Sequence, residues 1–81
     1  MSVSEIVLKE LENITGTNQV RKDLTLDLFG EKVLDSFGTL ELLLALSEDL
    51  DVKVTPGDID RELWATPQKI IDYFQERIKQ A

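Results

Sequence analysis

Cysteine and histidine are both absent from the chain. Without cysteine there is no disulfide and no thiolate metal site, and without histidine there is no imidazole to serve as a general base. These absences exclude most familiar catalytic arrangements, and we expect no metal centre. The chemistry of the protein must therefore depend on other residue types.

Positive charge is scarce, because 9 Lys and Arg stand against 16 Asp and Glu, for a net charge of −7. This balance repels phosphate backbones, so nucleic acid is an unsuitable ligand, and it favours a basic partner surface. An alternative is that the acidity only keeps the domain soluble. Long apolar runs are also missing, the longest being Leu42–Leu46. We expect no membrane insertion and no signal peptide, and hence a cytoplasmic protein.

What is present is enough for one folded domain. The 81 residues are 42% hydrophobic and 31% charged, and no repeat or linker divides them, so residues 1–81 are interpreted as a single domain. A domain of this size buries only about 60% of the surface of its unfolded chain. We therefore expect modest stability.

Helix signals mark both ends of the chain. Ser2 and Glu5 have capping-box spacing and Gly16 supplies a stop, which predicts a helix near residues 3–15. Thr66 and Pro67 form a cap followed by a proline, which predicts a last helix running to the C-terminal end. The apolar positions at helical intervals are Val3, Val7, Leu11 and Ile14 in the first helix and Ile70, Ile71, Phe74 and Ile78 in the last.

Between these ends we predict a long loop and two further helices. Residues 17–35 lack a sustained period and are interpreted as a long loop, a feature that is often functional. A helix capped by Ser36 should run to about Leu50, and a short third helix should start near Pro56 and end before Trp64. The sum is an all-α bundle of four helices. The loop should be held to the core by Val20, Leu24, Leu26, Leu28, Phe29, Val33 and Leu34.

Ser36 stands at the junction of the long loop and an apolar helix. Serine is a favoured N-cap, and Asp35 beside it suits the positive end of the helix dipole. From this pattern alone, capping and a covalent function both remain open for Ser36.

The helix that follows carries two apolar stripes. Leu42, Leu46 and Leu50 form one, and Phe37, Leu40 and Leu44 form the other. The second stripe is edged by Glu41 and Glu48, so it could receive the apolar pocket and basic rim of a partner. The alternative is a central helix buried on all sides.

The segment around Ser36 resembles the modification site of acyl and peptidyl carrier proteins, whose Asp-Ser-apolar motif carries 4'-phosphopantetheine on the serine. Ser36 matches that serine, and Asp35 matches the flanking recognition residue. Phe37 and Gly38 stand where many fatty-acid carriers have leucine and an acidic residue. Ser47 stands where those carriers often have glutamate. The matching run is Leu34-Asp35-Ser36-Phe37-Gly38-Thr39-Leu40-Glu41-Leu42-Leu43-Leu44-Ala45-Leu46.

A second run resembles the D-alanyl carrier proteins more specifically. We expect Trp64 to pack between helices and Arg61 to pair with a nearby carboxylate. The run is Asp60-Arg61-Glu62-Leu63-Trp64-Ala65-Thr66-Pro67-Gln68-Lys69-Ile70-Ile71.

The resemblance implies an acyl-carrier fold and a monomeric, non-catalytic protein that holds D-alanine as a thioester on phosphopantetheine at Ser36. Its implied partners are a phosphopantetheinyl transferase, a D-alanine-activating ligase and a membrane-bound D-alanyl acyltransferase of lipoteichoic acid biosynthesis. The implied partner-binding residues are Phe37, Leu40, Glu41, Leu44 and Glu48. Two alternatives remain, a carrier of another acyl or aminoacyl group and an acidic helical interaction module without an arm.

Overall fold

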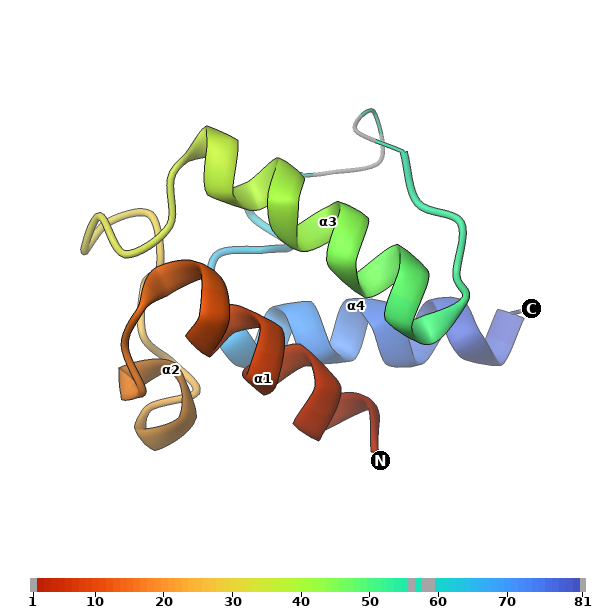
Figure 1. Ribbon diagram of the computed structural model, residues 1–81, viewed down its shortest axis with the longest axis horizontal. Helices are drawn as coiled ribbons and strands as arrows, with labels where there is room; N and C mark the ends of the chain where they lie inside the picture. Colours follow the sequence, from red (N-terminus) through yellow and green to blue (C-terminus); the bar gives the residue numbers. More distant parts are fainter. Residues whose placement is uncertain (1, 56, 58–59, 81) are drawn as a thin grey trace.

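The computed structural model describes residues 2–55, 57 and 60–80. These residues form four helices, α1 (Val3–Thr15), α2 (Gln19–Lys22), α3 (Ser36–Leu50) and α4 (Pro67–Gln80), as Figure 1 shows. Strands do not occur among the described residues. The predicted all-α class is confirmed.

The ends of α1 and α4 follow the predicted caps. The Ser2 hydroxyl accepts a hydrogen bond from the Glu5 N–H at 3.2 Å, and Gly16 ends α1 in the left-handed conformation with a φ of 73°. Glycine adopts this conformation without steric cost, which is why the helix stops there. At α4, the Thr66 hydroxyl accepts from the Lys69 N–H at 3.1 Å, and Pro67 is the first helical residue.

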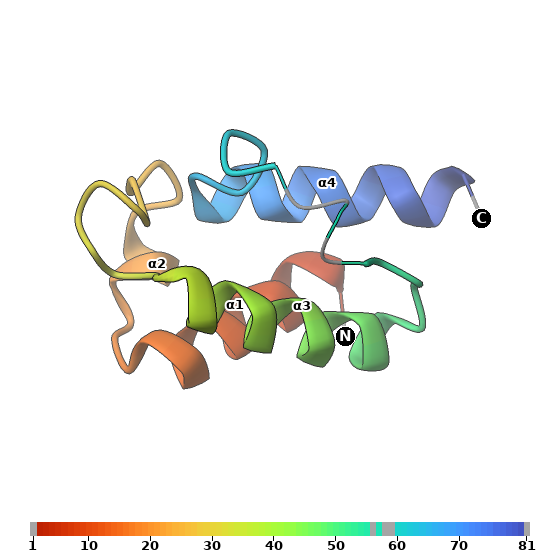
Figure 2. The ribbon, with the colours of Figure 1, turned by 90° about the horizontal axis from the view of Figure 1, so that it is seen from above.

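The three long helices lie side by side along the molecule, with α1 running opposite to α3 and α4 (Figures 1 and 2). Helix α1 contacts both α3 and α4, and it also contacts α2. Segment 16–35 stays at one end of the molecule, where α3 and α4 both begin. The start of α3 therefore lies at the same end of the molecule as the long connection and the start of α4.

The core lies between these helices and includes residues of the connections. Trp64 is fully buried beside Tyr73 and Phe74, with ring centroids 5.7 Å and 5.6 Å away in edge-to-face geometry. This confirms the predicted packing of Trp64. The other buried apolar residues are Val7, Leu8, Leu11, Val20, Leu28, Leu34, Leu42, Leu43, Leu46, Val54, Ile70 and Ile71. In the described part of the chain, none of the helices is long and apolar enough to cross a bilayer.

Residues 17–35 were predicted to be a loop, but four of them form the short helix α2. Val20 of α2 is buried, and Arg21 binds two carboxylates of α1, Glu5 at 2.9 Å and Glu12 at 2.7 Å. The hydrogen bond from Arg21 holds the pKa of Glu5 below its ordinary value of 4.5. The predicted attachment of this segment to the core is confirmed, since Val20, Leu28 and Leu34 are buried and Leu24, Leu26, Phe29 and Val33 pack against the core.

The short third helix was expected over residues 56–63, and residues 56, 58 and 59 of that stretch lie outside the described residues. Residues 61–64 form a turn instead of a helix, closed by a hydrogen bond of 3.1 Å from the Trp64 N–H to the Asp60 carbonyl. The short helix of the described chain is α2, in front of α3. A regular four-helix bundle with a short third helix stays a prediction.

Candidate functional site

The segment leading into α3 is fixed by backbone hydrogen bonds at both of its ends. The Leu28 carbonyl accepts from the N–H groups of Val33 and Leu34, each at 2.9 Å, so residues 28–34 fold into a compact turn. The Leu28 N–H in turn donates to the Ala65 carbonyl at 2.8 Å. The approach to Ser36 is thus held against the segment that precedes α4.

Asp35, and not Ser36, caps α3. The Asp35 backbone is extended, and its Oδ1 accepts a hydrogen bond from the Gly38 N–H at 2.6 Å. The Asp35 carbonyl accepts a second bond from the Thr39 hydroxyl at 2.7 Å. The predicted cap by Ser36 is wrong, because the aspartate one residue earlier reaches the third helical amide and makes Ser36 the first residue inside the helix.

Ser36 is left exposed, and its hydroxyl has no hydrogen-bond partner among the described residues. Among the described residues, the N–H groups of Ser36 and Phe37 also make no backbone hydrogen bond. The Gly38 N–H donates to the Asp35 side chain that caps the helix. Unpaired amides at a helix N-terminus stabilise an anion, and the helix dipole adds to this effect. A phosphate ester on Ser36 therefore fits the residues around it.

The far side of this helix turn is closed by α1. Gly38 is buried, and a Cβ atom there would lie 3.1 Å from a Leu34 methyl group and 3.4 Å from an Ile14 methyl group. The absence of a side chain lets the first turn of α3 approach α1 closely. Ser36 consequently faces solvent on the side of α3 that is away from α1.

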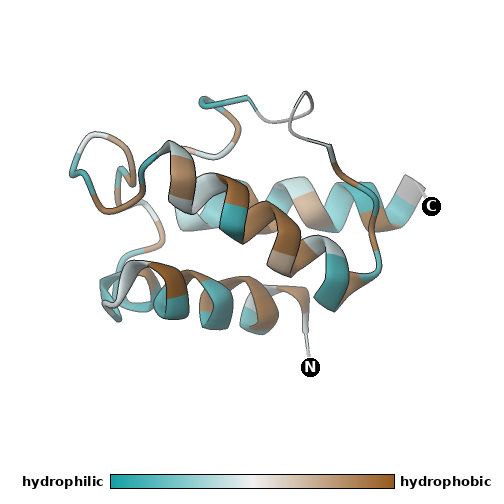
Figure 3. Cartoon of the chain, turned by 45° about the horizontal axis from the view of Figure 1, so that its top comes forward, coloured by the Kyte–Doolittle hydropathy of each residue, from teal (hydrophilic) through white to brown (hydrophobic). Residues whose placement is uncertain are grey.

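Helix α3 continues with an apolar outer face. Phe37, Leu40 and Leu44 are 70%, 43% and 67% exposed, whereas Leu42 and Leu46 are fully buried. In Figure 3 much of α3 carries the hydrophobic colour, interrupted by hydrophilic stretches. Glu41 and Glu48 are exposed beside the apolar residues. The alternative of a helix buried on all sides is wrong, and the predicted division into two stripes is confirmed. The exposed one, Phe37, Leu40 and Leu44, is called the outer stripe below.

The second matched run forms the support of this site. Asp60 Oδ1 accepts from the Glu62 N–H at 2.9 Å and shapes the turn that leads to Trp64. Arg61 does not pair with a carboxylate among the described residues. Its guanidinium carbon lies 4.7 Å from the centre of the Phe29 ring. The predicted ion pair is wrong, because Phe29 offers an aromatic face where a carboxylate was expected.

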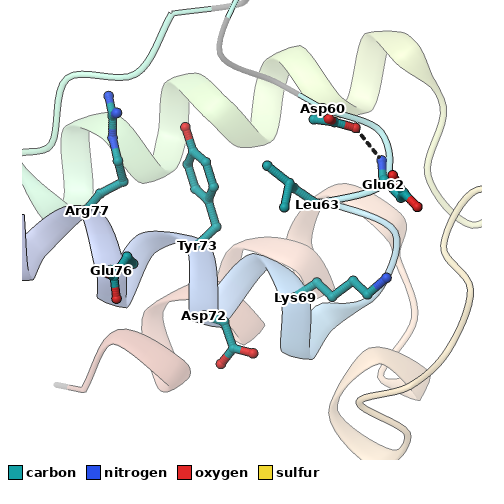
Figure 4. Close-up of a pocket in the computed structure, with 8 residues that line it drawn as sticks. All are labelled: Asp60, Glu62, Leu63, Lys69, Asp72, Tyr73, Glu76 and Arg77. Carbon is teal, nitrogen blue, oxygen red and sulfur yellow. Dashed lines mark hydrogen bonds between the residues drawn. The ribbon is translucent and has the colours of Figure 1, made fainter.

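Two further features of the surface were not predicted from the sequence. One is the bridge from Arg21 to α1, described above. The other is a shallow groove of about 720 Å³ along α4 and the turn before it, drawn in Figure 4. Tyr73 and Leu63 project toward the same side of α4 in that view, between charged side chains. The groove is lined by Asp60, Glu62, Leu63, Lys69, Asp72, Tyr73, Glu76 and Arg77.

The features of the site can now be taken together. A short all-α domain presents an exposed serine at the start of a helix, next to unpaired amides and an apolar outer stripe. The described residues contain no group of three acidic side chains suited to a metal ion. This combination matches what is expected of a small carrier protein.

Comparison with known proteins narrows the class. The chain is 44% identical over 75 residues to the D-alanyl carrier protein of Enterococcus faecalis. The aligned residues cover 93% of this chain and 96% of that protein. It is 42% identical over 76 residues to the D-alanyl carrier protein of Latilactobacillus sakei (94% and 97%) and 44% identical over 75 residues to that of Listeria monocytogenes (93% and 96%). No protein-family model matches. The chain belongs to the D-alanyl carrier protein family, and its role is that of a carrier.

Proposed function

We propose that the chain carries D-alanine on a 4'-phosphopantetheine arm attached to Ser36. The observation behind this proposal is the exposed Ser36 at the start of α3, whose hydroxyl has no hydrogen-bond partner among the described residues, in a chain of this family. The names of its relatives support D-alanine as the cargo. When bound, phosphopantetheine supplies a terminal thiol that holds the aminoacyl group as a thioester, which this chain cannot provide because it has no cysteine.

Attachment requires Ser36 to act as a nucleophile. Its Oγ attacks the β-phosphorus of coenzyme A, a new P–O bond forms, and the pyrophosphate bond breaks to release adenosine 3',5'-bisphosphate. We expect the hydroxyl proton to pass to a base supplied by the phosphopantetheinyl transferase. The N–H groups of Ser36 and Phe37, which make no backbone hydrogen bond among the described residues, would stabilise the negative charge of the phosphodiester.

The outer stripe is the surface that the partner enzymes contact. Its exposed apolar area lies beside Ser36, and the flanking carboxylates of Glu41 and Glu48 complement a basic rim. A D-alanine-activating ligase would load the arm with the use of ATP, and a membrane-bound acyltransferase would receive the D-alanyl group for teichoic acids. Because each partner must reach the arm in turn, we expect a cytoplasmic monomer with contacts that are selective and readily released.

Intact mass spectrometry tests the attachment. After incubation with coenzyme A and a phosphopantetheinyl transferase, the wild-type chain should gain the mass of one phosphopantetheine, and Ser36→Ala should gain none. A mass gain in the alanine variant would refute Ser36 as the site. No gain in the wild type would instead favour the acidic interaction module without an arm.

A second assay tests the cargo. The chain that already bears phosphopantetheine is incubated with ATP, a D-alanine-activating ligase and either D-alanine or other amino acids. Thioester formation with D-alanine alone is the expected result. Efficient loading with a different aminoacyl or acyl group would favour the alternative of a carrier for another assembly pathway.

A further inference from the structure

Arg61 occupies an unusual place for an exposed arginine. It belongs to the second matched run, yet it forms no ion pair with a carboxylate among the described residues. Its guanidinium lies over the ring of Phe29, with 4.7 Å between the guanidinium carbon and the ring centre. Both residues line a hollow of about 520 Å³, together with Asp27, Gly30, Asp60, Glu62 and Ala65.

Phe29 is part of the turn that sets the position of Ser36. The Phe29 carbonyl accepts from the Lys32 N–H at 3.1 Å, and Lys32 closes the turn with a positive φ of 58°. Leu34 follows and is buried. The next residue, Asp35, caps α3. A displacement of Phe29 therefore alters the turn from which the chain enters the helix at Ser36.

The other end of the contact is rigidly held. Arg61 stands in the turn that Asp60 closes through its carbonyl and its carboxylate. Trp64, at the end of that turn, is fully buried in the aromatic cluster. The segment also accepts the hydrogen bond from Leu28 to Ala65. Arg61 consequently lies next to Phe29 in a turn that is attached to the core.

We propose that Arg61 is a positioning residue for the modification of Ser36 and acts through the ring of Phe29. The contact holds the turn of residues 28–34 in the arrangement that presents the serine hydroxyl to the transferase. The inference rests on the proposed function, because it concerns attachment of the arm at the same serine. The segment of residues 60–71, which resembles D-alanyl carrier proteins, would thereby assist the attachment of the arm to Ser36.

A double-mutant cycle on the full chain tests this role. The rate of phosphopantetheine attachment is measured by intact mass, as kcat/KM, for wild type, Arg61→Gln, Phe29→Leu and the double variant. Each single substitution should lower kcat/KM by up to about fivefold, the ratio that corresponds to an exposed cation–π contact. The double variant should be no slower than the slower single variant, because both changes remove the same contact.

Two further variants separate positioning from other effects. Phe29→Tyr keeps the aromatic face and should retain the wild-type rate. Arg77→Gln removes the same charge from an arginine that lies 5.9 Å from the Tyr73 ring in the last turns of α4, and it should also leave the rate unchanged. Thermal melts of all variants confirm that they are folded at the assay temperature.

Each remaining outcome is decisive. If Arg61→Gln slows attachment equally in the wild-type and Phe29→Leu backgrounds, Arg61 contacts the transferase directly and the inference is wrong. Equal rates in all variants would also overturn it, while leaving the proposed function intact. Failure of the wild-type chain to accept the arm would instead refute the proposed function.

Discussion

Leu42 and Leu44 are two residues apart in the sequence but lie on opposite faces of α3. Replacing each of them by alanine should therefore affect stability very differently. Leu42 is completely buried, and Leu44 is 67% exposed. Replacing Leu42 by alanine leaves a cavity among core residues, which should cost about 2–5 kcal/mol. Full burial of a leucine side chain is worth about 1.5–3 kcal/mol. With only about a third of Leu44 hidden, Leu44→Ala should therefore cost less than about 1 kcal/mol.

These costs are large relative to the stability of the domain. At about 0.05–0.15 kcal/mol per residue, a chain of this length has a free energy of unfolding of about 4–12 kcal/mol. Leu42→Ala should thus remove a substantial fraction of that stability. The milder Leu42→Val is a useful companion variant, since it shortens the same buried side chain and keeps a measurable folded population if the alanine variant unfolds.

Urea titration followed by tryptophan fluorescence provides the assay, because Trp64 is the single tryptophan and is buried. With a slope of about 1–3 kcal/mol/M for a small domain, the midpoint should fall clearly for Leu42→Ala and only slightly for Leu44→Ala. Arm loading by the D-alanine ligase should show the reverse pattern, since Leu44 belongs to the outer stripe. Equal destabilisation by the two substitutions would refute the division of α3 into an inner and an outer face.

Three further predictions concern the cap, an ion pair and the surface charge. Asp35→Ala should lower the free energy of unfolding by about 0.5–2 kcal/mol through the lost cap, while Ser36→Ala should leave it nearly unchanged; denaturant titrations that give the opposite order would contradict the assignment of the cap. Arg21 lowers the pKa of Glu5 below 4.5, so the contribution of this pair is present above that pH and is lost as the pH falls through the folded-state pKa. Thermal melts of wild type and Arg21→Gln should accordingly differ at neutral pH and converge in acid, and a difference that persists at about pH 2 would count against the pair. Arm attachment should slow as ionic strength rises and slow further in Glu41→Lys; stopped-flow or quenched mass measurements that show no salt dependence would leave the acidity as a solubility feature.

The sequence was sufficient to predict the long helices, because their ends carry local signals. Ser2, Gly16 and the Thr66-Pro67 pair act on backbone groups within a few residues, so they are visible in the sequence order. The inner and outer faces of α3 were predictable for the same reason, since a helix places residues on its faces at a fixed period.

The features that were missed depend on contacts between distant segments. Helix α2 is too short to show a period, and it is held by the bond from Arg21 to α1. The contact of Arg61 with Phe29 joins two separate connections. The choice of cap failed for another reason. Asp35 and Ser36 are both good capping residues, and only the backbone geometry decides that the aspartate reaches the Gly38 amide.

The hydrogen bonds that join segment 24–28 to the start of α4 have a consequence for the order of events during synthesis. Leu28 donates to Ala65, and Gln68 donates to Leu24, so the turn before Ser36 is completed by residues from the last third of the chain. Ser36 leaves the ribosome before those residues do. A growing chain therefore exposes the serine without its final surroundings, and a transferase that reads those surroundings would modify only chains whose C-terminal part has been made and folded. The presence of the arm would then mark a completed domain.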